Sequence, residues 1–332
     1  MTSAAVMGCG SWGTALALVL ADAGARVRMC ARRSAVAAAI NAGGNAQYLP
    51  DVPLPAAISA TTDPRSALDG ADLVVLAVPA QTLREQVTAW APFWPDEALL
   101  LSASKGVEQG TVLRMSEVIT SVASAPPERV VVLSGPNLAG EVTRRQPAAA
   151  VLAATDEAVA ARVAGWLATG YFRPYTNVDV VGTELGGAVK NVVALAVGMA
   201  EGMGMGDNTK ASLITRGLAE TARLGVRLGA DPQTFMGLAG VGDLVATCMS
   251  PLSRNRTFGA NLGSGLSVAE VVARTRQTAE GVTSCHSVLD LARRHGVEMP
   301  IAEGVASVID GRHTPAEVVD HLMSRSRKHE RI

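Results

Sequence analysis

The sequence predicts an α/β domain with a doubly wound parallel sheet, followed by an all-α domain. Short apolar segments alternate with helical periods up to about residue 180, a pattern typical of a parallel sheet covered by helices. Beyond that point long helical periods dominate and strand-like segments are not recognisable. The length of 332 residues suits two domains, since domains commonly hold roughly 100–200 residues each. We therefore expect the domains at 1–180 and 181–332.

The individual elements follow from apolar runs and from helix-start signals. Strands are expected at residues 4–8, 26–31, 72–79, 97–106 and 129–137, with two more at 148–154 and 171–177. Helix starts are indicated where a capping side chain precedes Pro or stands three residues before Glu. These starts are Asp63 before Pro64, Asp231 before Pro232, Ser267 with Glu270, and Thr314 with Glu317. Asp207 and Asn208 are expected to cap a helix that begins at Thr209.

Composition excludes several classes of protein. The net charge is −1 and aromatic residues make up 3%, whereas nucleic-acid binders usually carry a basic excess or stacking aromatic side chains. The four cysteines form no CxxC pair, and the five histidines show no ligand spacing, so we expect neither a metal site nor disulfides. No apolar run reaches the ~20 residues of a membrane span, and no basic segment precedes the first apolar run. A reduced, cytoplasmic protein with no membrane or nucleic-acid partner is expected.

A glycine motif lies between the first expected strand and the helix that follows it. Gly8, Gly10 and Gly13 form G-x-G-x-x-G, and a second strand follows at the spacing of a βαβ unit. In such a unit the first glycine permits a tight turn, the second lets the backbone approach a pyrophosphate, and the third lets helix and strand pack closely. The helix N-terminus then presents free N–H groups to the phosphates. This motif predicts a Rossmann-type dinucleotide-binding domain.

The end of the second strand bears on the choice of coenzyme. A site selective for NAD carries Asp or Glu there for the ribose hydroxyls, but this chain has Ala31, Arg32 and Arg33. Two guanidinium groups suit a 2′-phosphate, so the sequence favours NADP(H), with NAD(H) possible. The alternative is that one or both arginines are merely exposed.

Polar residues follow two of the later strands. Lys105 ends the fourth expected strand, and the turn from Gly135 to Asn137 ends the fifth. Ligands of open parallel sheets bind beyond the carboxyl ends of the strands. We therefore expect these residues to face the same crevice as the glycine loop.

The segment 184–212 interrupts small and apolar residues with Lys190 and Asn191. Burying a lysine is costly unless it is paired, and a buried lysine is a candidate proton donor. The alternative is a lysine at a helix edge whose amine reaches solvent. Asn191 could hydrogen-bond a substrate oxygen, and Asp243 could hold a nearby ammonium group.

Residues 239–259 and 277–284 form two further polar segments. Donors suited to a phosphate ester are Thr247, Ser253, Arg254 and Asn255; a polar loop with a helix cap is the alternative. Glu280 could contact a ribose or a nicotinamide amide, or simply begin a helix.

Several of these motifs together resemble one enzyme family. GCGSWGTALA at 8–17, SASKG around Lys105, SGPNLAGE at 134–141, the segment 184–220, GVGDL followed by SRNR, and QTAEGV at 277–282 occur in family order over essentially the whole chain. The chain thus resembles the bacterial-type NAD(P)-dependent glycerol-3-phosphate dehydrogenases. The resemblance implies a Rossmann domain followed by a helical domain, a homodimer, and reversible reduction of dihydroxyacetone phosphate to sn-glycerol 3-phosphate for glycerophospholipid synthesis.

The resemblance also implies roles for individual residues. Catalytic roles fall to Lys190, which donates the proton, with Lys105 and Asp243. Substrate contacts are implied for Lys105, Gly135, Asn137, Lys190, Asn191, Asp243, Ser253, Arg254 and Asn255. The coenzyme contacts implied are Gly8, Gly10, Ser11, Trp12, Gly13, Arg32, Arg33, Tyr48, Lys105, Ala139, Arg254, Thr278 and Glu280.

Two positions depart from the family pattern. Relatives often carry Ser or Thr at the position of Asn137, and many carry Lys at that of Gly140. Two other functions stay open: a related two-domain dehydrogenase of β-hydroxy acids or sugar acids, and a non-catalytic NADP-binding sensor.

Overall fold

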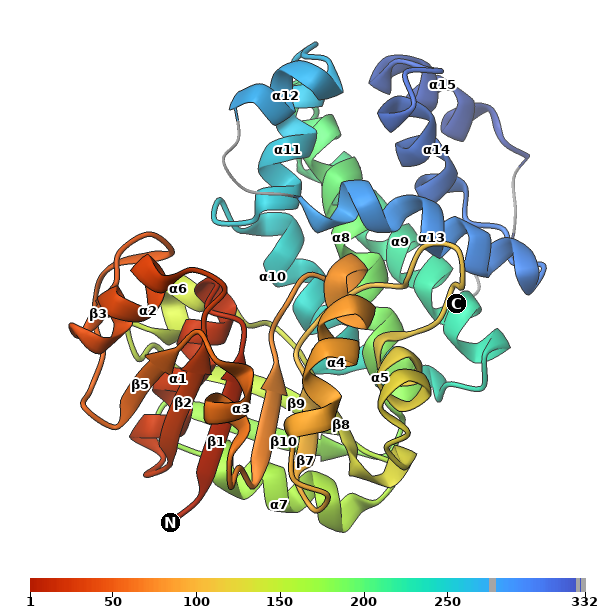
Figure 1. Ribbon diagram of the computed structural model, residues 1–332. Helices are drawn as coiled ribbons and strands as arrows, with labels where there is room; N and C mark the ends of the chain where they lie inside the picture. The colour runs from red at the N-terminus through yellow and green to blue at the C-terminus, as the bar shows by residue number, and fades with distance from the viewer. Residues whose placement is uncertain (275–278, 327–328, 330–332) are drawn as a thin grey trace. The chain divides into compact units, whose positions relative to one another are not determined.

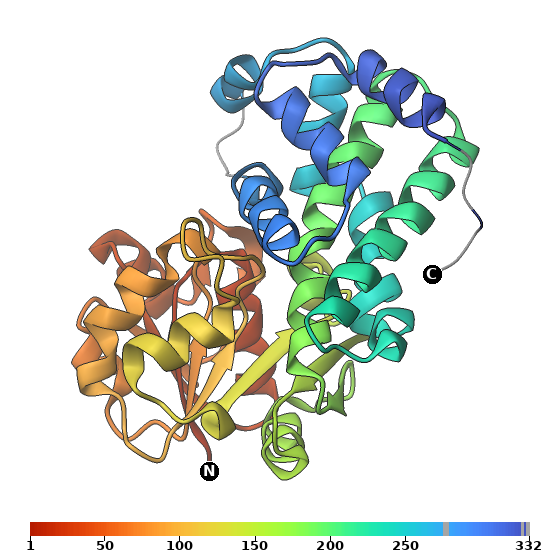
Figure 2. The same ribbon diagram turned by 90° about the vertical axis from the view of Figure 1, so that its right-hand side faces the viewer.

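The computed structural model describes residues 1–274, 279–326 and 329 (Figures 1 and 2). The chain divides into two compact units. The first unit holds Met1–Lys105 and Met115–Val180, and the second holds Gly106–Arg114 and Val181–Ile332. The sequence places a single boundary after residue 180. The structure divides the chain there too, but it corrects the expected domains by assigning Gly106–Arg114 to the second unit.

An eight-stranded sheet forms the centre of the first unit, in the order β10-β9-β8-β7-β6-β1-β2-β5. Its strands are β1 (Ser3–Met7), β2 (Arg26–Cys30), β5 (Ile58–Thr61), β6 (Leu73–Leu76), β7 (Leu99–Ser102), β8 (Val130–Ser134), β9 (Ala148–Ala153) and β10 (Phe172–Asn177). All seven strands expected from the sequence are present. The short edge strand β5 and a two-stranded ribbon, β3 (Gly44–Asn45) with β4 (Leu49–Pro53), were not predicted.

The sheet is mixed rather than wholly parallel. Strand β9 pairs antiparallel with β8, and β10 pairs parallel with β9, so these two strands run opposite to the other six. An antiparallel neighbour needs no crossover helix, because the chain re-enters the sheet at the edge it has just left. The apolar run at 148–154 predicts a buried strand but carries no information on its direction.

The order β5-β2-β1-β6-β7-β8 is the 3-2-1-4-5-6 order of dinucleotide-binding domains. The order reverses between β1 and β6, which pair in parallel from Ala4↔Leu73 to Met7↔Leu76. In such sheets the ligand crevice lies outside the carboxyl ends of the strands at this reversal. The glycine motif follows directly after β1, at this edge.

Helices cover both faces of the sheet. Strands β6, β7 and β8 are buried along their whole length, as expected for strands enclosed on both sides. Helix α1 packs beside α6 and α7, whereas α4 packs beside α5 and α3 packs on β1 and β2. These helices are α1 (Ser11–Asp22), α2 (Ser34–Asn41), α3 (Pro64–Leu68), α4 (Leu83–Trp90), α5 (Met115–Ala123), α6 (Ala139–Val142) and α7 (Glu157–Leu167). The predicted Rossmann-type fold class is confirmed.

The described part of the second unit is built from helices. They are α8 (Val180–Gly202), α9 (Asp207–Arg227), α10 (Asp243–Met249), α11 (Arg254–Gly263), α12 (Val268–Arg274), α13 (Glu280–Arg294), α14 (Pro300–Ile309) and α15 (Pro315–Ser324), with a π-turn at Leu238–Gly242 (Figure 1). The central helix α8 is buried from Gly182 to Ala200. It is long and apolar enough to cross a membrane, but 83% of its apolar window is buried inside the protein.

Helices α8 and α11 pack through glycines on both sides of their contact. A Cβ atom on Gly198 of α8 would lie 2.1 Å from the Arg256 carbonyl oxygen of α11. In the other direction, a Cβ atom on Gly259 would lie 2.2 Å from the Leu195 carbonyl oxygen. Gly202 and Gly263 repeat this arrangement one turn further along each helix. The two backbones are therefore in direct contact, which fixes the position of α11 relative to α8.

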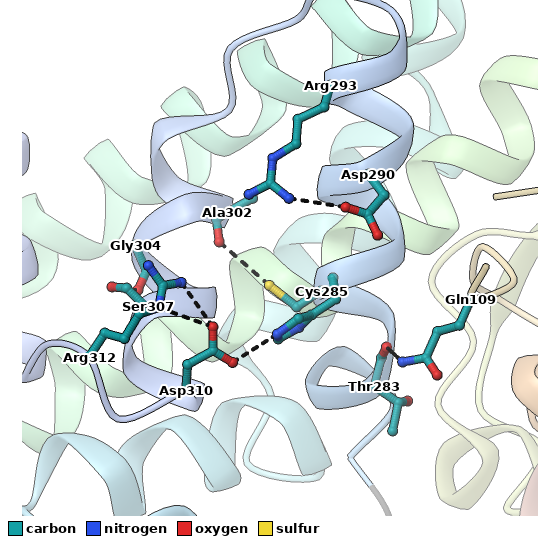
Figure 3. A network of polar contacts seen from close by, with 11 residues as sticks. Gln109, Thr283, Cys285, Asp290, Arg293, Ala302, Gly304, Ser307, Asp310 and Arg312 are labelled. Carbon is teal, nitrogen blue, oxygen red and sulfur yellow. Dashed lines mark hydrogen bonds and ion pairs between the residues drawn. The ribbon is translucent and has the colours of Figure 1, made fainter. Parts of the chain in front are cut away.

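The segment Gly106–Arg114 is tied to the helices of the second unit by polar contacts. Gln109 donates a hydrogen bond from Nε2 to the carbonyl oxygen of Thr283 in α13 (3.0 Å; Figure 3). Arg114 forms a 2.5 Å ion pair with Glu184 of α8. These partners lie far apart in the sequence, which is why no local pattern predicts where this segment belongs.

The predicted helix starts have three different outcomes. Thr314 and Glu317 form the expected capping box of α15, and Ser267 exchanges hydrogen bonds with Glu270 at the start of α12. Asp231 caps a 3₁₀ turn, Pro232–Met236, instead of an α-helix. The expectation for Asp207 and Asn208 is wrong: α9 begins at Asp207 itself, with Gly206 as the N-cap. The exposed Asp207 carboxylate pairs instead with Lys210 (2.6 Å).

A buried glutamate makes the stability of the second unit dependent on pH. Burial raises the pKa of Glu220 on α9 to about 7. Hydrogen bonds from the N–H groups of Ile301 and Ala302 lower this pKa, but the effect of burial is larger. The native state therefore binds this proton more tightly than the unfolded chain, so the free energy of unfolding falls as pH rises towards 7. Between pH 5.5 and 8 we expect a loss of about 2 kcal/mol that the Glu220→Gln variant lacks. Urea unfolding of both proteins at the two pH values measures this difference, and equal pH dependence would contradict it.

Candidate active site

The glycine loop is too tightly packed for other residues at two of its three glycines. Gly8 has a φ of +118°, and a Cβ atom there would lie 2.4 Å from the Ala77 carbonyl oxygen, which follows β6. A Cβ atom on Gly13 would lie 2.1 Å from the Gly8 carbonyl oxygen. The first glycine therefore permits the turn, and the third brings α1 onto the loop, as the motif predicts.

The middle glycine faces open space. A Cβ atom on Gly10 would meet no atom within 4 Å. Gly10 is also the N-cap of α1, where no side chain caps the helix, so the N-terminus presents its N–H groups and its positive dipole end to this space. A side chain at position 10 would occupy the place that a pyrophosphate needs. These residues fit a dinucleotide.

Several predicted coenzyme residues lie together beside this loop. Ser11 donates a hydrogen bond from Oγ to the Tyr48 carbonyl oxygen (2.9 Å). Arg33 donates from Nη2 to Gln47 Oε1 (2.7 Å) and to the Tyr48 hydroxyl (3.2 Å). Arg32 is exposed and makes no such contact within the described residues. One of the two guanidinium groups is therefore held in a fixed position, and the other extends into solvent.

Sequence reasoning missed two residues that organise this region. The buried Asn45 donates from Nδ2 to the Cys9 carbonyl oxygen (2.9 Å) and to Thr14 Oγ1 (2.8 Å). It thereby joins the β3–β4 ribbon to the glycine loop. Gln47 positions the Arg33 guanidinium. Neither belongs to a recognisable motif; the only available signal was their closeness to Tyr48 in the sequence.

The residues after β7 and β8 also meet. Lys105 donates from Nζ to the Gly135 carbonyl oxygen (3.1 Å). Gly135 has a φ of +112°, which favours glycine. Asn137 donates from Nδ2 to the Ser134 carbonyl oxygen (3.3 Å), while its Oδ1 is buried and has no partner among the described residues. An unpaired buried acceptor is costly, so this oxygen is a candidate acceptor for a ligand N–H or O–H group.

Two other predicted coenzyme residues of the first unit have less specific surroundings. Trp12 packs against the core of this unit, and its buried Nε1 has no hydrogen-bond partner in the described part of the chain. Ala139 begins the short helix α6, four residues after Gly135.

Lys190 is the centre of a buried polar cluster in the second unit. Its side chain is 10% exposed and forms an ion pair with Asp243, whose side chain is 1% exposed. Its Nζ also donates to Thr247 Oγ1 (2.9 Å), which in turn donates to the Asp243 carboxylate (3.3 Å). The Lys190 side chain is therefore buried and paired, which argues against the alternative of a lysine at an exposed helix edge. The ammonium group is held by a carboxylate and a hydroxyl.

A close backbone approach brings these groups together. A Cβ atom on Gly186 of α8 would lie 2.3 Å from the Ala239 carbonyl oxygen in the π-turn Leu238–Gly242. Lys190 lies one helical turn further along the same face of α8, and Asp243 begins α10 immediately after the π-turn. Gly186 thus sets the distance at which ammonium and carboxylate meet. The sequence signals each residue but not this contact.

A second polar cluster joins α8, α11 and α13. Asn255 donates from Nδ2 to Asn191 Oδ1 (2.9 Å) and accepts from the Gly281 N–H group (2.9 Å). Its carboxamide oxygen is therefore already engaged by backbone, which leaves its second N–H group for a ligand. Glu280 is the first residue of α13. Thr278, a predicted coenzyme residue, lies outside the described residues.

The start of α11 places Ser253 and Arg254. Ser253 Oγ accepts a hydrogen bond from the Arg256 N–H group (3.3 Å) and so caps the helix. Arg254 is exposed at the first helical position. Arg256, in the same first turn, forms an ion pair with Glu201 of α8, a contact that sequence reasoning missed. A helix N-terminus with an adjacent guanidinium is a suitable surface for a phosphate group.

Comparison with known proteins covers the whole chain. Residues 3–160 match the family model described as NAD-dependent glycerol-3-phosphate dehydrogenase N-terminus, and residues 179–320 match the corresponding C-terminus. The chain is 61% identical to "Glycerol-3-phosphate dehydrogenase [NAD(P)+]" of Streptomyces griseus over 99% of this chain and 98% of that protein. It is 59% identical to the protein of the same name from Thermobifida fusca, over 100% and 99% of the two chains.

A solved structure is similar over the same extent. The glycerol-3-phosphate dehydrogenase of Coxiella burnetii is 37% identical, with a TM-score of 0.93 over 98% of this chain and 99% of that chain.

Proposed function

The chain belongs to the NAD-dependent glycerol-3-phosphate dehydrogenase family, and from this premise we propose that it reduces dihydroxyacetone phosphate to sn-glycerol 3-phosphate, reversibly, with a nicotinamide coenzyme. The observation that carries the proposal is the buried cluster of Lys190, Asp243 and Thr247. A bound nicotinamide supplies the hydride for such a reaction.

Lys190 supplies the proton in this proposal. Reduction of a ketone develops negative charge on its oxygen, and a positioned ammonium group both stabilises this charge and donates a proton from Nζ. Asp243 holds the ammonium group in place, and Thr247 fixes its direction through the Oγ1 contact. In the reverse direction the amine accepts the proton from the substrate hydroxyl.

The other predicted residues bind and orient the substrate. The N-terminus of α11, with Arg254 and Ser253, is proposed to hold the phosphate group, so that binding energy away from the reacting carbon fixes its orientation. Asn191 and Asn255 contribute carboxamide N–H groups. Lys105, Gly135 and Asn137 complete the proposed substrate set, and the unpaired Asn137 Oδ1 supports an acceptor role for that side chain.

The proposed coenzyme site begins at the glycine loop. Gly10 and the N-terminus of α1 would hold the pyrophosphate. Further proposed coenzyme contacts, in both units, are Ser11, Trp12, Tyr48, Lys105, Ala139, Arg254, Thr278 and Glu280. We also propose a cytoplasmic homodimer that serves glycerophospholipid synthesis.

The decisive experiment follows the nicotinamide absorbance of purified protein mixed with dihydroxyacetone phosphate and NADPH or NADH. We expect turnover with this substrate and no turnover with a 3-hydroxy acid and oxidised coenzyme. Turnover of the hydroxy acid alone would favour the related dehydrogenase. Coenzyme binding without turnover of either substrate would favour the sensor.

A preference for NADPH is proposed from the arginines that follow β2. In the variant Gln47→Glu the new carboxylate would pair with Arg33 and repel a 2′-phosphate. Charged hydrogen bonds are worth about 1.5–3 kcal/mol, so we expect the KM for NADPH to rise at least tenfold and that for NADH to change much less. Gln233→Glu, the same charge change at an exposed position of the second unit, is the control. Equal effects on both coenzymes would overturn the proposed preference.

A further inference from the structure

A cavity of about 640 Å³ lies in the second unit among α9, α14 and α15. None of the proposed substrate and coenzyme residues lines it. Ligand sites usually span roughly 300–1,000 Å³ and combine an apolar wall with a few polar groups. The size of the cavity is thus that of a small-molecule site.

One wall of the cavity is apolar. Leu213 comes from α9, Ile301 from α14, and Leu322 and Met323 from α15. The Met323 side chain is unusually exposed for a large apolar residue, at 81%. These residues can bury a hydrocarbon chain but offer it no polar partner.

The acidic groups of the cavity already have partners. Glu220 accepts hydrogen bonds from the N–H groups of Ile301 (2.8 Å) and Ala302 (3.4 Å). Glu298 pairs with Arg325 (3.2 Å) through its carboxylate, and its carbonyl oxygen accepts from Arg223 (3.3 Å). Both carboxylates are therefore held by the protein itself.

Arg216 is different. It lines the cavity from α9 and is exposed, and the described part of the chain offers its guanidinium neither a hydrogen bond nor an ion pair. Three arginines thus face two already engaged carboxylates, which leaves positive charge beside an apolar wall. A guanidinium group binds carboxylates and phosphates through paired N–H donors.

We propose that this cavity binds a single-chain amphiphile with an anionic head group, a carboxylate or a phosphate monoester. The anionic head group of the ligand lies at Arg216 and Arg223, and its hydrocarbon chain lies along Leu213 and Leu322. This inference does not depend on the proposed reaction, because it uses none of the groups assigned to it.

Glu220 gives the site a further property. A bound anion beside Glu220 favours its protonated form, so the affinity falls as pH rises through the range in which this group titrates. The charged groups that act electrostatically on Glu220 are Arg223 on α9 and Glu303 within α14. Arg216, Glu298, Arg325 and His329 line the same cavity. A Glu220 variant therefore isolates the contribution of this carboxyl group to the pH dependence of binding.

Calorimetric titration of the full chain with octyl phosphate and with octanoate, each below its micelle concentration, tests the site. The two probes distinguish a phosphate head group from a carboxylate. We expect saturable binding of at least one probe, at least tenfold weaker binding to Arg216→Gln, and unchanged binding to Arg162→Gln, an exposed arginine of the first unit. Octanol has the hydrocarbon chain without the charge, and inorganic phosphate has the charge without the hydrocarbon chain. Both should bind at least tenfold more weakly than whichever of octyl phosphate and octanoate binds more tightly.

The pH dependence of binding is measured with octanoate if it binds, and otherwise with octyl sulfate. The charge of either ligand stays constant between pH 6 and 8. Wild-type affinity should fall at least threefold between pH 6 and 8, and the Glu220→Gln variant should lose most of this dependence while remaining folded by circular dichroism. Absence of binding, equal binding to Arg216→Gln, or octanol binding as tightly as the anions would overturn the proposal. If a second copy of the protein covers the cavity, no binding will be observed.

Discussion

Replacing Lys190 with alanine is expected to lower kcat by about 10²–10⁴, the usual contribution of a positioned proton donor. The change removes the ammonium group from Asp243 and Thr247 and leaves a carboxylate that is 1% exposed without its cation. Breaking a buried pair in this way costs about 3–5 kcal/mol of stability, so activity is compared at a temperature where circular dichroism shows a folded protein. Steady-state kinetics with dihydroxyacetone phosphate measure the effect.

Two further measurements separate a chemical role of Lys190 from a structural one. Added primary amines should restore part of the activity of Lys190→Ala, since they replace the missing proton donor in the space it leaves. Lys210→Ala is the matched control, because Lys210 pairs with the exposed Asp207 on the same unit, and such surface pairs contribute little. A kcat within threefold of the wild type in Lys190→Ala would refute the assignment.

Replacing Gly198 with alanine is expected to destabilise the second unit by about 1–3 kcal/mol, at the upper end of this range because the clash is with backbone. The added Cβ atom would lie 2.1 Å from the Arg256 carbonyl oxygen and 2.9 Å from the Ala260 amide nitrogen, both in the backbone of α11. Backbone atoms cannot rotate away, so α11 must shift, and Arg254 and Asn255 shift with it. We therefore expect a lower unfolding temperature and a raised KM for dihydroxyacetone phosphate, measured by thermal unfolding and steady-state kinetics.

Gly165→Ala is the control for the Gly198 variant. Gly165 lies in α7, and a Cβ atom there meets nothing within 4 Å. Alanine should stabilise this helix by about 0.5–1 kcal/mol, because glycine costs more conformational entropy. An unfolding temperature of Gly198→Ala equal to that of the wild type would contradict the close packing of α8 and α11.

The residues expected to carry the chemistry were mostly recognisable in the sequence, but several of their contacts were not. Lys190 interrupts an apolar helix, and the two arginines replace the acidic residue expected after β2; both are local signals. Asn45 and Gln47 carry no such signal, since their partners lie in the glycine loop and at Arg33, the N-cap of α2. Lys190 and Asp243 are 53 positions apart in the sequence. Their side chains meet only because Gly186 lets α8 approach the π-turn closely.

The sequence by itself determined the elements: seven of the strands, the glycine turn before α1, the helical second half and the capping box at Thr314. These follow from apolar periodicity, capping and backbone freedom, which act over a few residues. Only the tertiary structure decided the direction of β9, the assignment of Gly106–Arg114 to the second unit, and the pairing of Lys190 with Asp243. Each depends on contacts between segments distant along the chain, whose free energy exists only once the helices and strands have packed.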